Sequence, residues 1–151
     1  MQPTPNVERS AAQVLTELLL LLNQNAQTWE DLLAEDAVFE APYAPLALER
    51  LEGKEAVCNL IKTAGLQMQD MRFSNIQVYP TTNPNLAWAE FHGEAVAVAT
   101  GRPYQQDYVV KLKTREGQII LYREYANPMS TIEAWDGTQN LQQAFNAEDA
   151  A

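Results

Sequence analysis

The stretch Leu86–Ala99, LAWAEFHGEAVAVA, alternates two kinds of side chain along its length. Alternate residues of a β-strand point to opposite faces of a sheet. One set here is small or apolar, which is typical of close packing. The other set includes Trp88, Glu90, His92 and Glu94, and this mixture is typical either of a pocket wall or of a solvated surface. The stretch therefore predicts a long strand with two different faces.

Three further runs continue the strand pattern, at residues 72–79, 104–114 and 118–126. Residues 115–117, Arg-Glu-Gly, predict a short hairpin loop, because Gly accepts a left-handed conformation. Short loops between neighbouring strands imply antiparallel pairing. Pro128, after Asn127, ends the last strand, since proline cannot donate to the ladder.

Helices are expected mainly before these strands. Apolar residues between Val7 and Leu22 recur at three- and four-residue steps, as on one face of a helix. Thr28, with Asp31 three residues later, predicts the start of a short second helix. Residues 54–68 form the third helix. A short strand at 37–41 and an ordered loop at 42–53 lie between the second and third helices.

The C-terminal part adds little to the expected domain. Ser130 and Glu133 predict a capping box that opens a short last helix through Trp135. The fold class is therefore α+β: a cone-shaped, curved antiparallel sheet packed on three helices from the N-terminal half, with a short C-terminal helix. We expect a single domain over residues 7–136, with flexible termini at 1–6 and 138–151.

Composition and charge exclude several classes of partner. The chain has 151 residues and a formal net charge of −10, which repels phosphate backbones and anionic lipids. We therefore expect neither nucleic acid nor membrane as a partner. Met1–Glu8 lacks the features of a signal peptide, the longest apolar run, Leu18–Leu22, is too short to span a bilayer, and the single cysteine, Cys58, fits a reducing compartment. These features predict a cytoplasmic protein.

Familiar catalytic motifs are absent from the sequence. There is one histidine, His92, and one cysteine, so a zinc site built from these residue types is not expected. The six glycines are scattered and form no phosphate-binding loop. The prediction is that the protein uses no metal and no other cofactor.

Glu124 is an acid in the middle of the last strand, where glutamate is disfavoured unless it is solvated, paired or functional. If it is buried among the neighbouring aromatic side chains, desolvation raises its pKa and makes it a candidate general acid or base. The alternative is an exposed or arginine-paired glutamate. Tyr122 shares a face with Glu124.

Tyrosines offer an apolar body and one hydrogen-bonding group, as pocket walls require. Tyr104 and Tyr108 share a face of the neighbouring strand, and Tyr43 follows the first strand. These residues, with Trp88, Glu90 and Tyr122, are candidate substrate-binding residues, although tyrosines serve core packing equally well.

The stretch from Trp29 to Pro45, together with Leu51–Ala56, resembles the opening of a SnoaL-like, polyketide-cyclase-like domain of the nuclear transport factor 2-like superfamily. Residues 88–94 and 122–128 are similar to the phenazine-biosynthesis A/B-type branch, and the resemblance covers roughly residues 10–136. It implies the cone-shaped fold and a homodimer with the outer sheet face buried. In that branch a strand carboxylate within an Arg-Glu-aromatic-x-Asn-Pro segment acts in the pocket, and here that residue is Glu124.

Three functions follow from these observations. The first is an isomerase-, cyclase- or condensing-type enzyme that acts on a small apolar, carbonyl-bearing molecule, with Glu124 moving the proton and His92 or Glu90 assisting. A ketosteroid-isomerase-type site also needs an oxyanion donor, which Tyr43, Tyr104 or Tyr108 could supply. The second is a non-catalytic ligand-binding domain, and the third is an interaction domain that dimerises through its sheet.

Overall fold

The computed structural model describes residues 8–46 and 50–146. The helices and strands follow in this order: α1 (Ala11–Asn23), the 3-10 helix η1 (Gln27–Leu32), β1 (Leu33–Glu40), β2 (Arg50–Glu52), α2 (Lys54–Gln67), β3 (Met68–Pro80), β4 (Leu86–Ala97), β5 (Pro103–Arg115), β6 (Gln118–Tyr125), α3 (Pro128–Ala134) and α4 (Thr138–Phe145). The expected flexible arm at residues 1–6 lies outside the described residues.

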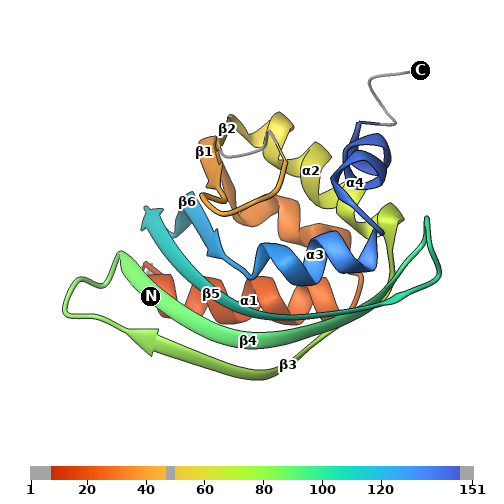
Figure 1. Cartoon of the computed structure of the whole chain (residues 1–151). Coiled ribbons are helices and arrows are strands. Elements are labelled where there is room, and N and C mark those ends of the chain that lie inside the picture. The colour runs from red at the N-terminus through yellow and green to blue at the C-terminus, as the bar shows by residue number, and fades with distance from the viewer. Residues whose placement is uncertain (1–7, 47–49, 147–151) are drawn as a thin grey trace, which may run out of the picture.

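One curved sheet of six strands, in the order β2-β1-β6-β5-β4-β3, forms the scaffold. The helices lie on its concave side, with α1 in the hollow above the long strands β3, β4 and β5 (Figure 1). The expected α+β class with a curved sheet is confirmed. All pairings are antiparallel except that of β1 with β6, which is parallel. The parallel pairing departs from the prediction, because it joins segments far apart in the chain that no short loop connects.

Two irregularities bend β3 along β4. The register shifts between Gln69 and Arg72 and again between Ser74 and Gln77. Asp70 and Asn75 have positive φ angles of 58° and 52° at these places, and Asp and Asn are the residues other than glycine that tolerate this conformation best. Such β-bulges bend a strand and increase its twist, so they contribute to the hollow in which the helices lie.

The small apolar face of β4 packs inward, as its pattern predicted. Ala87, Ala89 and Ala97 are fully buried, and so are Leu15 and Leu19 of α1. Because alanines keep this face of the strand flat, the α1 backbone can approach the sheet closely. The helix begins at a capping box in which the Ser10 Oγ accepts a hydrogen bond of 3.2 Å from the Gln13 amide.

Helix ends differ from the sequence prediction in two places. The segment from Gln27 is a 3-10 helix capped at Ala26 without a side-chain hydrogen bond, so the expected Thr28–Asp31 capping box does not form. Helix α3 begins at Pro128, and its cap is Asn127 rather than Ser130. A proline at the first helical position is already shaped for the helix, and the Asn127 Oδ1 accepts a hydrogen bond from the Met129 amide at 3.0 Å.

The C-terminal segment is more ordered than expected. Residues 138–145 form helix α4, with Leu141 fully buried and Ala144 nearly so. Phe145 packs on the buried Trp135 at 5.8 Å between ring centroids. The expectation of a flexible tail is therefore wrong for these residues, whereas residues 147–151 lie outside the described part of the chain.

Candidate active site

A cavity of about 560 Å³ lies between the concave face of the sheet and the helices. The predicted apolar stripe of α2 forms one of its walls rather than packing into a closed core. Other walls come from α1, from the inner faces of the sheet and from Phe145 of α4. Side chains that line it from these elements include Leu18, Leu60, Phe39, Met71 and Phe73. The size and the mainly apolar lining are those of a small-molecule site.

Glu124 is the titratable acid that the structure places at this cavity. It lies on β6 opposite Val110 of β5, and both side chains point to the concave face. Among the described residues no hydrogen bond or ion pair reaches its carboxyl group. Desolvation in the apolar surroundings therefore raises the pKa of Glu124 from its ordinary 4.5 to about 7.

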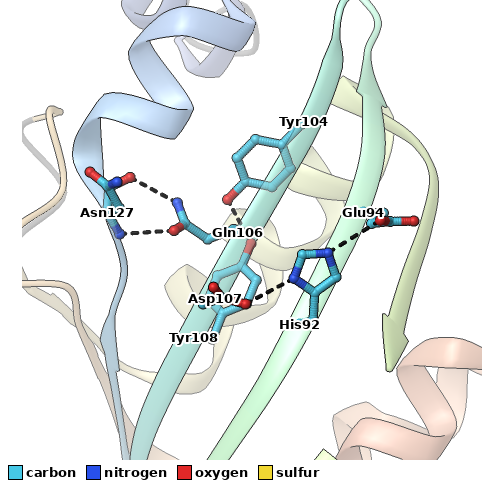
Figure 2. Close-up of polar contacts among 7 residues, drawn as sticks. All are labelled: His92, Glu94, Tyr104, Gln106, Asp107, Tyr108 and Asn127. Carbon is cyan, nitrogen blue, oxygen red and sulfur yellow. Dashed lines mark hydrogen bonds and ion pairs between the residues drawn. The ribbon is translucent and has the colours of Figure 1, made fainter. Parts of the chain in front are cut away.

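Two tyrosines on β5 form a buried hydroxyl pair near this carboxyl. The Tyr104 and Tyr108 oxygens are joined by a hydrogen bond of 2.6 Å (Figure 2). Both residues line the cavity. Burial raises the pKa of Tyr104 and raises that of Tyr108 well above 10, and the negative charge of Glu124 adds to both shifts. Both hydroxyls therefore stay protonated at neutral pH and can donate hydrogen bonds.

Tyr122 of β6 and Tyr43 of the β1–β2 loop line other parts of the cavity. Tyr122 stacks on Phe39, with 5.8 Å between ring centroids, and burial raises its pKa well above 10. Tyr43 is 62% exposed, so it lies at the mouth of the cavity rather than at its base. The structure thus brings together Glu124 and four of the tyrosines named from the sequence.

The other three candidates, Trp88, Glu90 and His92, do not line the cavity. They project from β4 on the convex face of the sheet, opposite to Glu124. Trp88 stacks on Tyr125, with 6.4 Å between ring centroids, and Glu90 is exposed. The expectation that they share a pocket with Glu124 does not match this placement. The expectation arose because Trp88, next to polar residues, made this face of the strand resemble a pocket wall.

His92 belongs to a separate polar cluster on that convex face. Its Nδ1 lies 2.9 Å from Asp107 Oδ1 and its Nε2 lies 3.2 Å from Glu94 Oε1 (Figure 2). The hydrogen bond to Asp107 is the main reason that the pKa of His92 is raised. The cluster is separated from the cavity by the sheet itself, so His92 cannot exchange a proton directly with Glu124.

Several residues that shape the cavity were not identified from the sequence. Gly93 lies under the Tyr108 ring, where a methyl group would come within 2.7 Å of a ring carbon. Gln106 and Thr131 lie near the Tyr104 hydroxyl, and both lower its pKa against the effect of burial. Gln106 lies between two predicted site residues and on their face of the strand, and this position was the available signal.

Within residues 8–46 and 50–146, no group of three or more His, Cys, Asp or Glu side chains is arranged to hold a metal ion. None of the helices in this part of the chain combines the length and the apolar character needed to cross a membrane.

Comparison with known proteins places this chain in a family. Residues 16–122 match the SnoaL-like domain model, so the match ends before Glu124. An uncharacterized PhzA/B-like protein of Pseudomonas aeruginosa is 39% identical over 132 residues, covering 86% of this chain and 93% of that protein. A solved structure from Bacillus subtilis is 35% identical with a TM-score of 0.76, covering 84% of this chain and 93% of that one.

A more distant solved structure, from Catenulispora acidiphila, is described as having a ketosteroid isomerase-like fold in complex with trimethylamine. It is 15% identical with a TM-score of 0.66, and the match covers 89% of this chain and 95% of that one. At this identity the likeness concerns the fold. The extent of the family match and the 39% identity to the PhzA/B-like protein are decisive: the chain belongs to the SnoaL-like domain family.

Proposed function

We propose that this protein is an enzyme of the isomerase or cyclase kind that moves a proton on a small, apolar, carbonyl-bearing substrate, with Glu124 as general acid and base. One observation carries the proposal: the Glu124 carboxyl, which has no hydrogen-bond or ion-pair partner within residues 8–46 and 50–146, lies in an apolar cavity and has a pKa of about 7. A group with this pKa is present in both protonation states at neutral pH, so it can accept a proton and return it.

In the proposed reaction, Glu124 both removes the proton from the substrate and returns it. The Glu124 carboxylate removes a proton from the carbon next to the substrate carbonyl, and the electron pair of that C–H bond moves onto the carbonyl oxygen. The neutral hydroxyl pair of Tyr104 and Tyr108 donates a hydrogen bond to this oxygen while it is negatively charged. The protonated Glu124 then delivers the proton to another atom of the substrate and is regenerated.

The test uses 2-tetralone, an apolar ketone with acidic protons next to its carbonyl. We expect the protein to accelerate the exchange of these protons in heavy water, measured by proton NMR. Glu124→Gln should slow the catalysed exchange by roughly 10² to 10⁴-fold, the usual contribution of a general base. Glu90→Gln, on the exposed convex face, is the matched control and should change nothing. Equal exchange by wild type and Glu124→Gln would refute the proposal.

A non-catalytic ligand-binding protein is the alternative, and one observation favours it. His92, the candidate assistant to Glu124, lies on the opposite face of the sheet beside Asp107, so it cannot assist at a substrate in the cavity. In this case 2-tetralone binds in the cavity, quenching tryptophan fluorescence through Trp29, but its protons exchange at the uncatalysed rate.

We also propose that two copies of the chain pair through the convex face of the sheet in the cytoplasm. The stacked Trp88 and Tyr125 support the pairing, together with the exposed Val109 (38%) and Tyr79 (44%) on the same face. Analytical ultracentrifugation should give a dimer, and Val109→Lys should weaken it. A monomer at all concentrations would refute this arrangement.

A further inference from the structure

Gln106 is a buried amide on the cavity side of β5, between Tyr104 and Tyr108. Its side chain makes two hydrogen bonds to one residue, Asn127. The Gln106 Nε2 donates to the Asn127 carbonyl at 2.8 Å, and the Asn127 amide donates to Gln106 Oε1 at 2.9 Å (Figure 2). Gln106 is only 2% exposed, so the two bonds form where water cannot replace them.

These two bonds fix the corner at Asn127, where the chain turns from β6 into α3 and strand pairing has ended. The ladder between β5 and β6 ends at the pair Val109–Tyr125, and Asn127 lies beyond it. The Gln106 side chain therefore continues the attachment of the chain to β5 after the strand pairing has stopped. It does so just past Glu124, at the point where the chain turns from β6 into α3.

Through Asn127, the two hydrogen bonds also fix part of the cavity wall. Its side chain caps α3, and Pro128 and Thr131 of that helix line the cavity together with Asn127 itself. Thr131 and Gln106 also lie near the Tyr104 hydroxyl, and both lower its pKa. The Gln106 side chain thus lies between the two tyrosines and holds the start of α3, just after the strand that bears Glu124.

We propose that Gln106 is a positioning residue: by holding the corner at Asn127 against β5, it closes the cavity wall beside Glu124 and keeps water from that carboxyl. Its importance for turnover rests on the function proposed above. Its effect on the environment of Glu124 does not depend on that function and can be measured without a substrate.

The experiment follows the titration of Glu124 by carbon NMR of glutamate labelled at the side-chain carboxyl, with Glu124→Gln to assign the signal. Gln106→Met has similar length but forms neither hydrogen bond, so the corner loosens and water enters. The pKa of Glu124 should fall from about 7 toward its ordinary 4.5, by about one unit or more.

Gln105→Met is the matched control, because Gln105 neighbours Gln106 on the same strand but is exposed on the other face. It should leave the titration of Glu124 unchanged. If Gln106→Met is folded and titrates like wild type, Gln106 does not control this carboxyl and the proposal is wrong. A shift in Glu124 without any catalysed exchange of 2-tetralone would support the role of Gln106 while refuting the proposed enzyme.

A second measurement needs no variant, in case Gln106→Met does not fold. In the wild-type protein the Asn127 amide should exchange with heavy water at least about tenfold more slowly than an exposed amide of the chain, because Gln106 accepts its hydrogen bond. An Asn127 amide that exchanges as fast as an exposed one would mean that the corner is open in solution, which contradicts the proposal.

Discussion

On the concave face of the sheet the Glu124 carboxyl lies in an apolar cavity, whereas on the convex face the His92 imidazole lies between Asp107 and Glu94. Both groups have raised pKa values, but for different reasons. Desolvation by burial raises the pKa of Glu124, while a hydrogen bond to Asp107 is the main cause that raises that of His92. The hydrogen-bonding partners stabilise the charged form of His92. Desolvation instead stabilises the neutral form of Glu124 and brings its pKa close to neutral pH, where the group can change its charge.

The largest expected effect concerns the cost of ionising Glu124. Its folded pKa of about 7 lies above the ordinary 4.5, so the folded protein binds this proton more tightly than the unfolded chain. Stability therefore falls as pH rises between these two values and stays low above them. Glu124→Gln removes the cost, and at pH 8 it should be more stable than wild type by up to about 3 kcal/mol.

Urea unfolding at several pH values measures this difference. The pH-dependent difference between wild type and Glu124→Gln should become small as the pH falls to 4.5. There the folded Glu124 is almost fully protonated and the unfolded one is half protonated. Glu90→Gln, an exposed acid of the convex face, should show no such divergence. A constant difference between wild type and Glu124→Gln at every pH would mean that Glu124 does not titrate near 7.

A second effect concerns packing under the tyrosine pair. A methyl group at Gly93 would lie 2.7 Å from a Tyr108 ring carbon and 3.4 Å from Phe73. Gly93→Ala should therefore lower the free energy of unfolding by about 1 to 3 kcal/mol and displace the Tyr108 ring. Gly65→Ala in α2 is the control, since a methyl group there meets no atom within 4 Å. It should raise stability by up to about 1 kcal/mol, as expected for Ala in a helix.

Thermal unfolding of both glycine variants, read by circular dichroism, distinguishes the two positions. Equal stability of Gly93→Ala and wild type would show that the ring of Tyr108 can move aside, and that the concave face is less tightly packed than the contact distances indicate.

Much of this scaffold could be predicted because it depends on local patterns. The strand runs and the apolar stripes of the helices appear directly in the sequence, and Tyr122 and Glu124 share a face as expected. The parallel pairing of β1 with β6 and the bulges at Asp70 and Asn75 could not be predicted, because they depend on contacts between distant segments. Helix α4 carried a signal, since Leu141, Ala144 and Phe145 recur at helical spacing.

The site was harder to predict than the scaffold. Alternation assigns residues to two faces of a strand but does not say which face is concave when both carry aromatic side chains. On β4 the mixed face with Trp88 and His92 is convex, whereas on β6 the mixed face with Tyr122 and Glu124 is concave. Only the register across β5, which places Glu124 opposite the buried Val110, resolves this ambiguity.

A third, smaller effect concerns the buried hydroxyl pair. Tyr104→Phe removes one hydroxyl and leaves the buried Tyr108 hydroxyl without its 2.6 Å partner, which should lower stability by roughly 1 kcal/mol. Tyr43→Phe at the mouth of the cavity is the control, because Tyr43 is 62% exposed and its hydroxyl can bond to water. Chemical denaturation of both variants at neutral pH measures the difference. If the two changes cost the same, the buried hydroxyl pair is as accessible to water as the mouth of the cavity.

The smallest effect belongs to the convex cluster. Asp107→Asn removes the main cause of the raised pKa of His92, so the imidazole should titrate closer to its ordinary 6.5. A raised histidine pKa contributes stability that is fully present below 6.5 and is lost as pH rises through the raised value. Because Asp107 is 92% exposed, the loss should stay below about 1 kcal/mol and appear only at acidic pH. Proton NMR of this single histidine measures the shift directly, and the Glu124 titration should not respond to the change. If Asp107→Asn leaves the pKa of His92 raised, the convex face holds its charge through the wider acidic surface rather than through one hydrogen bond, and the contrast with the concave face lies in burial alone.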